Sequence, residues 1–513
     1  MSRRTAAALM ITRGEGRALE VYLAERAPEL RFFGGYWAMP GGTIGRDDLA
    51  PPSAAAPLDE DAALQICADR ELFEETGLLR HRLSPQGAAR AALREHRRLL
   101  LEHERRDKEA PPQPSPWHAV VADAPAPPEL RALCRIETPA FSPVRYDTVF
   151  FHVPVEGCVA GTDGVEPDVW EGELTRGRFW RPEEALASWR SGELLLVPPV
   201  IIMLEHLEAA ADFEQFAEDI AATADGYRGG DLHKVRFSPG VVLAPLQTPT
   251  LPPATTTNCY IIGHDELWVV DPGSPDPQEQ QRLLHMLDTL TADGQRLAGV
   301  LLTHHHPDHV GGVQALCEAR GLKAHGHPRT LARISEEIPR GDELIDGAVI
   351  PLGDAPDGRP GWQLEALHTP GHDQGHLCFH ESRYGAMIVG DMLSTISTII
   401  IDPPEGHLAT YLRSLERLEQ HSISTLYPAH GPAVRNGRRL IQKYLRHRNQ
   451  REAALVKALS EQPGDVAALL PRVYWDADER LYPFAARSLQ AGLEKLAEEG
   501  RASERDGTWR LDA

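Results

Sequence analysis

Residues 304–309 read HHHPDH and follow directly on an apolar run, so four histidines and one aspartate stand within six positions. Imidazole nitrogens together with a carboxylate are the ligand set that suits zinc and similar borderline metals. The useful subset has the spacing H-x-H-x-D-H and comprises His304, His306, Asp308 and His309. These residue types at this spacing predict a metal site rather than a solvated polar loop.

Three later segments each place another candidate ligand at the end of a strand-like run. HTPGHDQGH contains His372 in a Pro-Gly turn, VGDML contains Asp391, and YPAHGP contains His430. Loops held by a rigid scaffold are where a sheet-based site gathers its ligands. In order and context, these motifs resemble the metallo-β-lactamase superfamily over residues 235–435.

The resemblance implies a binuclear centre with Zn²⁺, and the same ligand types accept Mn or Fe. Seven ligands are implied: His304, His306 and His372 for one metal, Asp308, His309 and His430 for the second, and Asp391 as the bridge. Such a pair polarises a substrate oxygen and lowers the pKa of a shared water, which gives hydroxide at neutral pH. Asp308 is therefore expected to serve catalysis as well as metal binding.

The remaining histidines near these motifs are expected to support the ligands or the fold. His305 lies between two candidate ligands and should point away from the metals, while His368, His376 and His380 flank the Pro-Gly turn. Ligating imidazoles commonly bond a supporting group through their other nitrogen. Asp271 in VVDPGS matches a recurrent position of the superfamily and either orients a ligand or simply forms an Asp-Pro-Gly turn.

A second candidate site lies upstream, in RELFEETGLL at residues 70–79. Glu71, Glu74 and Glu75 stand at i, i+3 and i+4, so a helix would place all three carboxylates on one face. Like charges so close together are costly unless a cation neutralises them, and Mg²⁺ and Mn²⁺ prefer oxygen ligands. The spacing predicts a Mg²⁺ or Mn²⁺ site, with an amphipathic surface helix as the alternative.

GGYWAMPGG before this helix and REL-EETG within it resemble the Nudix hydrolases. The resemblance implies that Arg70 orients the glutamates, that Glu71, Glu74 and Glu75 hold the metal, and that Glu74 and Glu75 are catalytic. FFGGYWAMPGG, RYDTVFF and FWRPEEAL resemble in particular the branch that contains coenzyme A diphosphatases.

One departure from the Nudix motif concerns activity. The motif has a glutamate eight positions before the arginine, where this chain has Ala62 after a long spacer. A further acid, Glu171 or Glu173, would then serve as the base. Alternatively, the domain binds a nucleotide or coenzyme without hydrolysing it.

The C-terminal region predicts a winged-helix-like module, because helices there are followed by a segment typical of a hairpin. LIQKYLRHRNQREAAL and the terminal LYPFAARSLQAGLEKLAEEGRASERDG resemble the tail of the lactamase-like endoribonucleases. Residues 434–457 contain a single acid, Glu452, and eight basic residues: Arg435, Arg438, Arg439, Lys443, Arg446, Arg448, Arg451 and Lys457. Such density could contact the phosphates of single-stranded RNA or could be a solvated helix face.

These motifs must be positioned by several domains, because 513 residues exceed one ordinary core. By resemblance the fold class is α+β multidomain. A Nudix α/β/α sandwich with helical and Pro-rich insertions is expected at 1–230, a metallo-β-lactamase αββα sandwich at 231–435, and a winged-helix-like domain at 436–513. A Gly-rich polar stretch at 224–240 predicts the first linker.

Composition narrows the class of protein. Hydrophobic residues make up 42% and charged residues 25%, and no apolar run approaches the ~20 residues of a membrane span, so a cytoplasmic protein without a membrane partner is expected. The six cysteines form no C-x-x-C pair, which argues against a thiolate zinc site. A net charge of -22 disfavours nucleic-acid binding through the whole surface, although a local basic patch could override it.

The leading hypothesis is a hydrolase with two metal sites. Its metallo-β-lactamase domain would direct metal-activated hydroxide at a phosphodiester, RNA-like substrate, and its Nudix domain would act on or bind a nucleoside diphosphate-linked small molecule such as coenzyme A. The alternative is a thioester or ester hydrolase, glyoxalase II-like or acyl-thioester, with a non-catalytic Nudix sensor. Both substrates, the metal and the oligomeric state are open at this point.

Overall fold

The computed structural model describes residues 3–30, 33–49, 57–83, 90–104, 115–122, 124–160, 166–170, 172–292 and 294–512. They form two compact units, Met1–Pro139 with Val144–Asp231, and Ala140–Pro143 with Leu232–Ala513. The bounds of the three domains expected from the sequence stay a prediction. Among the described residues, no helix combines the length and the apolar character needed to cross a bilayer.

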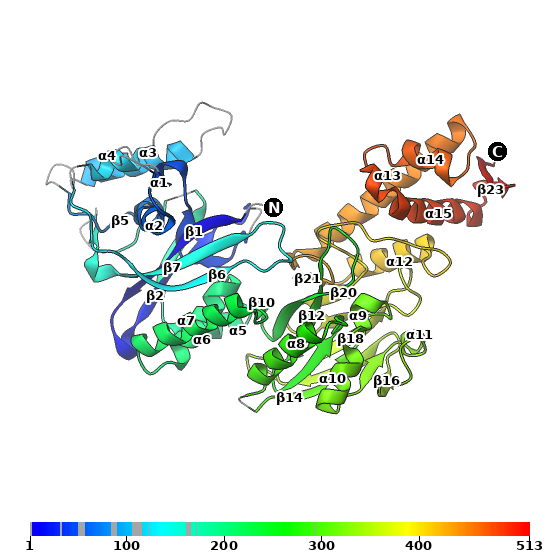
Figure 1. The fold of residues 1–513 in the computed structure, drawn as a ribbon, viewed down its shortest axis with the longest axis horizontal. Coiled ribbons are helices and arrows are strands. Elements are labelled where there is room, and N and C mark those ends of the chain that lie inside the picture. The colour runs from blue at the N-terminus through cyan, green and yellow to red at the C-terminus, as the bar shows by residue number, and fades with distance from the viewer. Residues whose placement is uncertain are drawn as a thin grey trace. The chain divides into compact units, whose positions relative to one another are not determined.

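The first unit is built on one seven-stranded mixed sheet (Figure 1). Its strands are β1 (Arg4–Arg13), β2 (Glu20–Arg26), β3 (Trp37–Ala38), β4 (Gly41–Thr43), β6 (Arg131–Glu137), β7 (Tyr146–Pro154) and β9 (Leu174–Trp180). The order is β3-β2-β1-β7-β6, with β4 beside β1 and β9 beside β2, and β1 runs parallel to β7. Because side chains alternate along β1, Leu9 and Ile11 pack on one face and Met10 on the other.

Helices cover both faces of this sheet. The helix α2 (Glu60–Thr76) packs Leu64 and Leu72 on the face that carries Leu9 and Ile11. The other face is covered by α5 (Pro182–Arg190), α6 (Pro198–Ala209) and α7 (Phe213–Gly229). The expected α/β/α sandwich is therefore confirmed.

The insertions of the first unit are more helical than expected. The charged segment forms α3 (Arg90–Glu104) as predicted. The Pro-rich segment at 111–130, of which residues 111–114 and 123 lie outside the described part, has a composition typical of a loop, but it contains α4 (Trp117–Val121). The reason is burial, because Trp117 and Val120 pack against Phe73 in one apolar cluster with α3. A two-stranded sheet of β5 (Leu78–Leu79) and β8 (Val159–Ala160) lies beside α2.

A buried histidine in this insertion makes the first unit sensitive to acid. His81 lies edge-on to Trp117, and burial, with a contribution from Arg80, lowers its pKa to about 4. The unfolded chain, with an ordinary pKa of about 6.5, binds a proton before the folded chain does, so stability falls as the pH drops from about 6.5 to about 4. We expect His81→Gln to reduce this slope in urea unfolding at pH 7 and pH 5. An unchanged slope in the variant would contradict the assignment.

The linker between the two units is shorter than the stretch 224–240 expected from composition. The helix α7 continues to Gly229, because Ala224 is buried against the sheet, and Gly230 closes it at a φ of 115°. The strand β10 (Val235–Ser238) then begins the second unit.

The second unit contains two sheets. The first has the order β10-β11-β12-β13-β14-β15-β16 and the second β17-β18-β19-β20-β21-β22. The remaining strands of the first sheet are β11 (Val241–Gln247), β12 (Thr256–Gly263), β13 (Glu266–Val270), β14 (Arg296–Leu301), β15 (Ala324–Gly326) and β16 (Arg340–Glu343). Those of the second are β17 (Ala348–Gly353), β18 (Trp362–His368), β19 (Leu377–Glu381), β20 (Ala386–Gly390), β21 (Thr425–Pro428) and β22 (Val434–Arg435).

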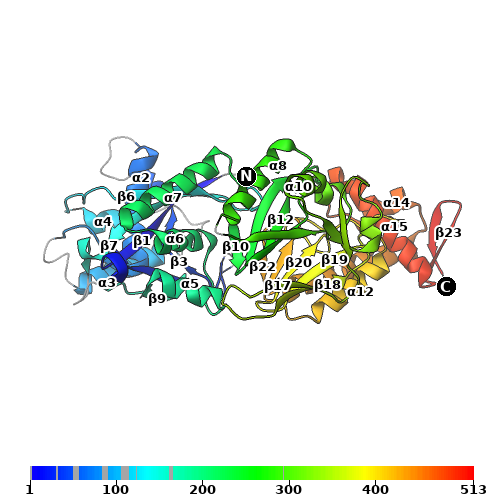
Figure 2. The same cartoon turned by 90° about the horizontal axis from the view of Figure 1, so that it is seen from below.

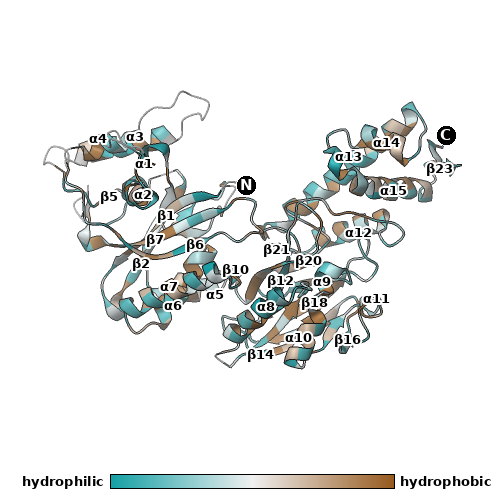
Figure 3. Cartoon of the chain, in the orientation of Figure 1, coloured by the Kyte–Doolittle hydropathy of each residue, from teal (hydrophilic) through white to brown (hydrophobic). Residues whose placement is uncertain are grey.

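Helices flank the two sheets on their outer sides. On the first sheet these are α8 (Pro277–Leu290) and α10 (Val313–Arg320), with the short helices α9 (Pro307–Val310) and α11 (Pro328–Leu331) in connecting loops. On the second sheet they are α12 (Leu408–Glu419) and the first half of α13 (Gly437–Glu461), and Figure 2 shows α12 beside the strand β18. Figure 3 shows hydrophilic residues on α8, in contrast to the apolar strands of the sheet that it covers. The expected αββα sandwich is confirmed.

The C-terminal module has a core of its own. It consists of the second half of α13, then α14 (Val466–Val473), α15 (Tyr482–Glu498) and the hairpin β23 (Ala502–Arg505) and β24 (Thr508–Leu511). Leu455, Leu469, Leu493 and Trp509 pack together at its centre. Three helices followed by a hairpin match the winged-helix-like module expected from the sequence.

Candidate functional site

The seven candidate ligands of the second unit lie at the ends of strands from both sheets. His304, His306, Asp308 and His309 follow β14, His372 follows β18, Asp391 follows β20, and His430 follows β21. The short helix α9 begins with Pro307 and carries Asp308 and His309. A Cβ at Gly273 would meet the Asp308 carbonyl oxygen at 1.8 Å, so only glycine lets the chain after β13 approach this loop.

The ligand atoms of His304, His306, His372 and Asp391 form a first group, in which all lie within 4.8 Å of one another. The His304 Nε2 atom is 3.0 Å from His306 Nδ1, and His372 Nε2 is 3.1 Å from the same His306 Nδ1. Burial lowers the pKa of His306 to about 4 and that of His304 well below its usual value, so both rings are neutral near pH 7. Three ring nitrogens that converge in this way suit a common cation.

Asp308, His309 and His430 form a second group with the same 4.8 Å limit. The Asp308 Oδ2 atom lies 3.5 Å from His430 Nε2 and 3.8 Å from His309 Nε2. Asp391 lies between the two groups, with Oδ2 3.6 Å from His372 Nε2 and Oδ1 3.3 Å from His430 Nε2. The structure thus brings all seven predicted residues together.

Two buried atoms at the centre of this cluster lack hydrogen-bond partners among the described residues. They are His309 Nε2 and Asp391 Oδ1, which lie 3.7 Å apart. Burial alone would raise the pKa of Asp391, but His430 and His309 outweigh it and hold the pKa well below its usual range, so the carboxylate is ionised. A buried carboxylate oxygen without a hydrogen bond is costly unless a cation meets it. The donor set therefore fits a pair of divalent metals.

A shell of hydrogen bonds fixes the rings of this cluster. Asp271, at a φ of 50° after β13, accepts a hydrogen bond from the Thr303 backbone N–H at 2.8 Å and lies 2.8 Å from His309 Nδ1. His372 Nδ1 lies 2.9 Å from the Ile400 carbonyl oxygen. Asp271, for which an orienting role and a simple turn were both open, contacts His309 directly.

We expect Asp271→Asn to weaken zinc binding by about 10- to 100-fold, as is typical when a group that orients a ligating histidine is lost. Asparagine tolerates the left-handed backbone at this position, so the change tests the carboxylate rather than the turn. Competition for Zn²⁺ with a chelator measures the affinity. Asp342→Asn, on an exposed side chain, is the control, and equal affinities for the two variants would contradict the orienting role.

The other histidines near the cluster bond to groups of the protein. His376 Nε2 accepts from the Asp391 backbone N–H at 3.2 Å and so supports the loop of that residue. His305 Nδ1 lies 2.7 Å from Asp373 Oδ2, and His305 also belongs to a third group of possible metal ligands with His306, Asp373 and Glu405, so its expected place outside the metal site stays a prediction. His368 and His380 lie 3.0 Å and 3.3 Å from the carbonyl oxygens of Gln374 and Ser422.

A charged network beside the cluster was not predicted. Asp373 is buried, its Oδ2 atom lies 3.5 Å from Arg333 Nη1, and Arg333 also contacts Glu405. Arg333 supplies the positive charge that these two acids require. The sequence signal was the aspartate directly after TPGH, but its partner Arg333 stands forty positions earlier, so no local pattern links them.

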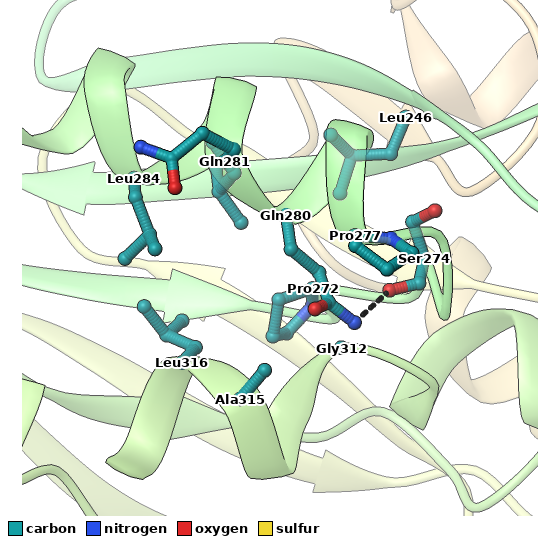
Figure 4. A pocket seen from close by; sticks show the side chains of 11 residues that line it. Leu246, Pro272, Ser274, Pro277, Gln280, Gln281, Leu284, Gly312, Ala315 and Leu316 are labelled. Atoms are coloured by element: carbon teal, nitrogen blue, oxygen red, sulfur yellow. Dashed lines mark hydrogen bonds between the residues drawn. The ribbon is translucent and has the colours of Figure 1, made fainter. Parts of the chain in front are cut away.

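Two cavities in the second unit differ in chemistry. One, of about 230 Å³, lies between α8 and α10; Figure 4 shows its mainly apolar lining and the 3.0 Å hydrogen bond from Gln280 Nε2 to the Ser274 carbonyl oxygen. None of the seven candidate ligands lines it. The other is a groove of about 530 Å³ that includes Gly371, next to His372, and Glu405. Its polar lining includes Arg329, Gln374 and Thr410.

The predicted carboxylate cluster of the first unit lies on α2 as expected. Asp59 caps the start of the helix, Gly77 closes it at a φ of 71°, and Glu71 and Glu74 are buried. Arg70 Nη1 donates to Glu71 Oε1 and to Glu74 Oε2, both at 2.8 Å.

Glu75 completes the carboxylate cluster from the same helix. It accepts the Gly41 backbone N–H of β4 at 2.7 Å, and burial, followed by the charge of Glu71, raises its pKa well above the usual range. A Cβ at Gly42 would meet Glu71 Oε1 at 2.1 Å, so the glycine loop leaves room for that carboxylate. Among the described residues, the groups whose ligand atoms lie close enough together to hold a metal are all in the second unit, so the Mg²⁺ or Mn²⁺ site on these carboxylates stays a prediction.

The role of Glu171 or Glu173 as the base that would compensate for Ala62 stays a prediction. Ala62 lies in the first turn of α2, Glu173 is exposed but contributes to the raised pKa of Glu75, and Glu171 lies outside the described residues. A residue that sequence reasoning missed, Asp48 of α1 (Arg46–Leu49), contacts Arg70 instead.

The basic helix α13 is only partly available to an anionic partner. Arg448 is buried, donates to the Ile399 carbonyl oxygen and lies over the Tyr411 ring. Arg451 donates to the Val473 carbonyl oxygen at 2.9 Å and pairs with Asp476 at 2.8 Å. Arg439, Lys443 and Arg446 are exposed and make no ion pair with a described residue. The eight basic residues therefore do not act as one surface.

Comparisons with known proteins match three parts of the chain. Family profiles described as metallo-beta-lactamase superfamily, beta-lactamase associated winged helix domain and NUDIX domain match residues 252–430, 466–509 and 1–129. A lactamase-like protein of Pestalotiopsis fici is 30% identical over 293 residues, 53% of this chain and 86% of that protein. An atrochrysone carboxyl ACP thioesterase of Aspergillus novofumigatus is 28% identical over 281 residues, 52% of this chain and 81% of that protein. A solved metallo-beta-lactamase family protein of Thermus thermophilus is 24% identical, with a TM-score of 0.44 over 53% of this chain and 99% of that chain.

Proposed function

This chain belongs to the metallo-β-lactamase superfamily and is a hydrolase that also carries a Nudix domain, and from that premise we propose that it hydrolyses acyl thioesters at one metal site and a coenzyme A-like diphosphate at the other. The observation that carries the proposal is the convergence of seven histidine and aspartate side chains around two buried atoms without hydrogen-bond partners, His309 Nε2 and Asp391 Oδ1.

The proposed ligands of the two metals correspond to the two groups of side chains described above. His304, His306 and His372 would hold one metal, Asp308, His309 and His430 would hold the other, and Asp391 lies close enough to both groups to serve either. The nitrogen-rich set suits Zn²⁺, with Mn or Fe as alternatives. When bound, the pair supplies a nucleophile from water at neutral pH and positive charge for a developing oxyanion. Asp271 and His376 keep His309 and the Asp391 loop in place.

An acyl thioester is the substrate class that the molecule supports best. Relatives matched over most of their length include proteins named as ACP thioesterases. The chain carries a net charge of -22, and Arg448 and Arg451 of the basic helix are engaged with the protein. The groove beside His372 offers Arg329, Gln374 and Thr410 as donors for the amide and phosphate groups of a pantetheine carrier.

A phosphodiester such as single-stranded RNA is the second candidate. One observation favours it, namely that Arg439, Lys443 and Arg446 are exposed at helical spacing on α13, next to the winged-helix module. Binding through such residues loses affinity steeply as the salt concentration rises.

Turnover of acyl thioesters and of single-stranded RNA at two salt concentrations separates these candidates. We expect thioester hydrolysis that changes little with salt and is unaffected by neutralising Arg439, Lys443 and Arg446 together. A matched control neutralises Arg480, which is exposed and paired with Asp478. RNA cleavage that weakens steeply with salt and in the triple variant alone would overturn the thioester proposal.

The Nudix domain is proposed to hold Mg²⁺ or Mn²⁺ on Glu71, Glu74 and Glu75, with Glu74 and Glu75 as the catalytic carboxylates. Burial of Glu71 and Glu74 beside Arg70 supports this role. The proposed substrate is a nucleoside diphosphate-linked compound such as coenzyme A. Tight binding without turnover would favour the alternative of a non-catalytic sensor.

A further inference from the structure

Asp48 belongs to none of the motifs described from the sequence, yet both of its carboxylate oxygens accept hydrogen bonds from Arg70. Its Oδ1 atom accepts from Arg70 Nε at 3.1 Å and its Oδ2 atom from Arg70 Nη2 at 2.9 Å. The side chain is 2% exposed. Asp48 Oδ2 also accepts the Gly45 backbone N–H at 2.8 Å, so the loop that delivers the carboxylate is fixed by it.

The two-pronged contact determines how Arg70 faces the glutamates. With Nε and Nη2 occupied by Asp48, the remaining nitrogen, Nη1, meets Glu71 Oε1 and Glu74 Oε2 at 2.8 Å each. A guanidinium is planar and its donors are fixed relative to one another, so anchoring one edge orients the other. Without Asp48, the same arginine could rotate about its long side chain.

Helix geometry explains why position 62 is not where this acid is found. The helix α2 already begins at Glu60, so Ala62 and Arg70 belong to one continuous helix. Eight residues of α-helix rise about 12 Å, which is too far for a side chain at position 62 to reach the guanidinium. The long spacer instead folds back as α1 and brings in Asp48, twenty-two positions before Arg70.

We propose that Asp48 is a positioning residue of the cation site and takes the place of the acid that is missing at Ala62. The inference rests on the proposed function of the Nudix domain. Through Arg70, Asp48 holds the carboxylates of Glu71 and Glu74 in the arrangement that a divalent cation requires. The departure from the motif at Ala62 then does not indicate an inactive domain.

The test compares Asp48→Asn, Asp48→Glu and a matched control, Asp69→Asn, in the full-length zinc-loaded chain. Asp69 lies on the same helix as Arg70, is also buried and pairs with another arginine, Arg80, at 2.8 Å. Mn²⁺ affinity is measured by electron paramagnetic resonance. We expect Asp48→Asn to weaken Mn²⁺ binding by about 10- to 100-fold, Asp48→Glu to restore most of it, and Asp69→Asn to leave it unchanged.

The outcomes separate the inference from the proposed function. Equal Mn²⁺ affinity in wild type and Asp48→Asn, or equal losses in Asp48→Asn and Asp69→Asn, would overturn the role of Asp48. Mn²⁺ binding that depends on Asp48 without any diphosphate hydrolysis would support the positioning role and refute the proposed diphosphatase. No Mn²⁺ binding by the wild type would overturn both.

Discussion

Asp391→Asn should lower kcat/KM for thioester hydrolysis by roughly 10³-fold or more, since it removes a carboxylate that faces both groups of candidate ligands. Its two oxygens lie 3.6 Å from His372 Nε2 and 3.3 Å from His430 Nε2. An amide cannot give charged oxygens to two cations, and metal-assisted hydrolysis depends on several kcal/mol of charge stabilisation. Steady-state kinetics with metal analysis by mass spectrometry measures both effects.

A matched control is Glu381→Gln in the same unit. Glu381 is also buried, but it accepts from Trp362 Nε1 at 2.7 Å and supports a turn rather than the cluster. We expect this variant to keep its metal and its thioesterase rate. Diphosphate hydrolysis by Asp391→Asn should equal that of the wild type, which shows that the chain is folded. Full thioesterase activity in Asp391→Asn would refute the site.

Glu74→Gln should abolish diphosphate hydrolysis, with a loss of roughly 10³-fold or more, and leave thioester hydrolysis unchanged. Glu74 is 2% exposed and receives a hydrogen bond from Arg70 Nη1 at 2.8 Å. The neutral amide keeps the size of the side chain but cannot neutralise a divalent cation. Release of the nucleotide product, followed by chromatography at fixed Mg²⁺, measures the rate.

Glu25→Gln provides the comparison for this effect. Glu25 belongs to the same unit and pairs with Arg176 of β9 at 2.6 Å. Its diphosphatase rate should match that of the wild type. A Glu74→Gln enzyme as active as Glu25→Gln would remove Glu74 from the catalytic group and favour the sensor alternative.

The members of the ligand cluster could be predicted because each belongs to a short sequence motif that follows an apolar strand. His304, His372, Asp391 and His430 all follow an apolar strand, and strands of packed sheets bring their ends together. Register and strand order cannot be read from such runs, but the family resemblance implied which residues would form one site. Predicting these ligands therefore required almost no knowledge of contacts between distant segments.

The parts that escaped prediction depend on contacts between distant segments. Asp48 reaches Arg70 from a spacer that carries no motif, and Asp373 meets Arg333 from another loop. The same holds for α4, where burial of Trp117 outweighs a Pro-rich composition typical of loops. The basic residues of α13 looked alike in sequence, yet packing buries Arg448 and leaves Arg446 exposed.

The two halves of α13 belong to two different hydrophobic cores. This arrangement determines how short a fragment containing the metal site could be made. Its first half contributes Ile441 and Tyr444 to the core beneath the second sheet. The Tyr444 hydroxyl donates to the Ser394 carbonyl oxygen at 2.8 Å and accepts the Ser394 backbone N–H at 2.9 Å, just after Asp391. A fragment cut at the last candidate ligand would lose the brace of that loop, so the first half of α13 is part of the metal domain's own architecture.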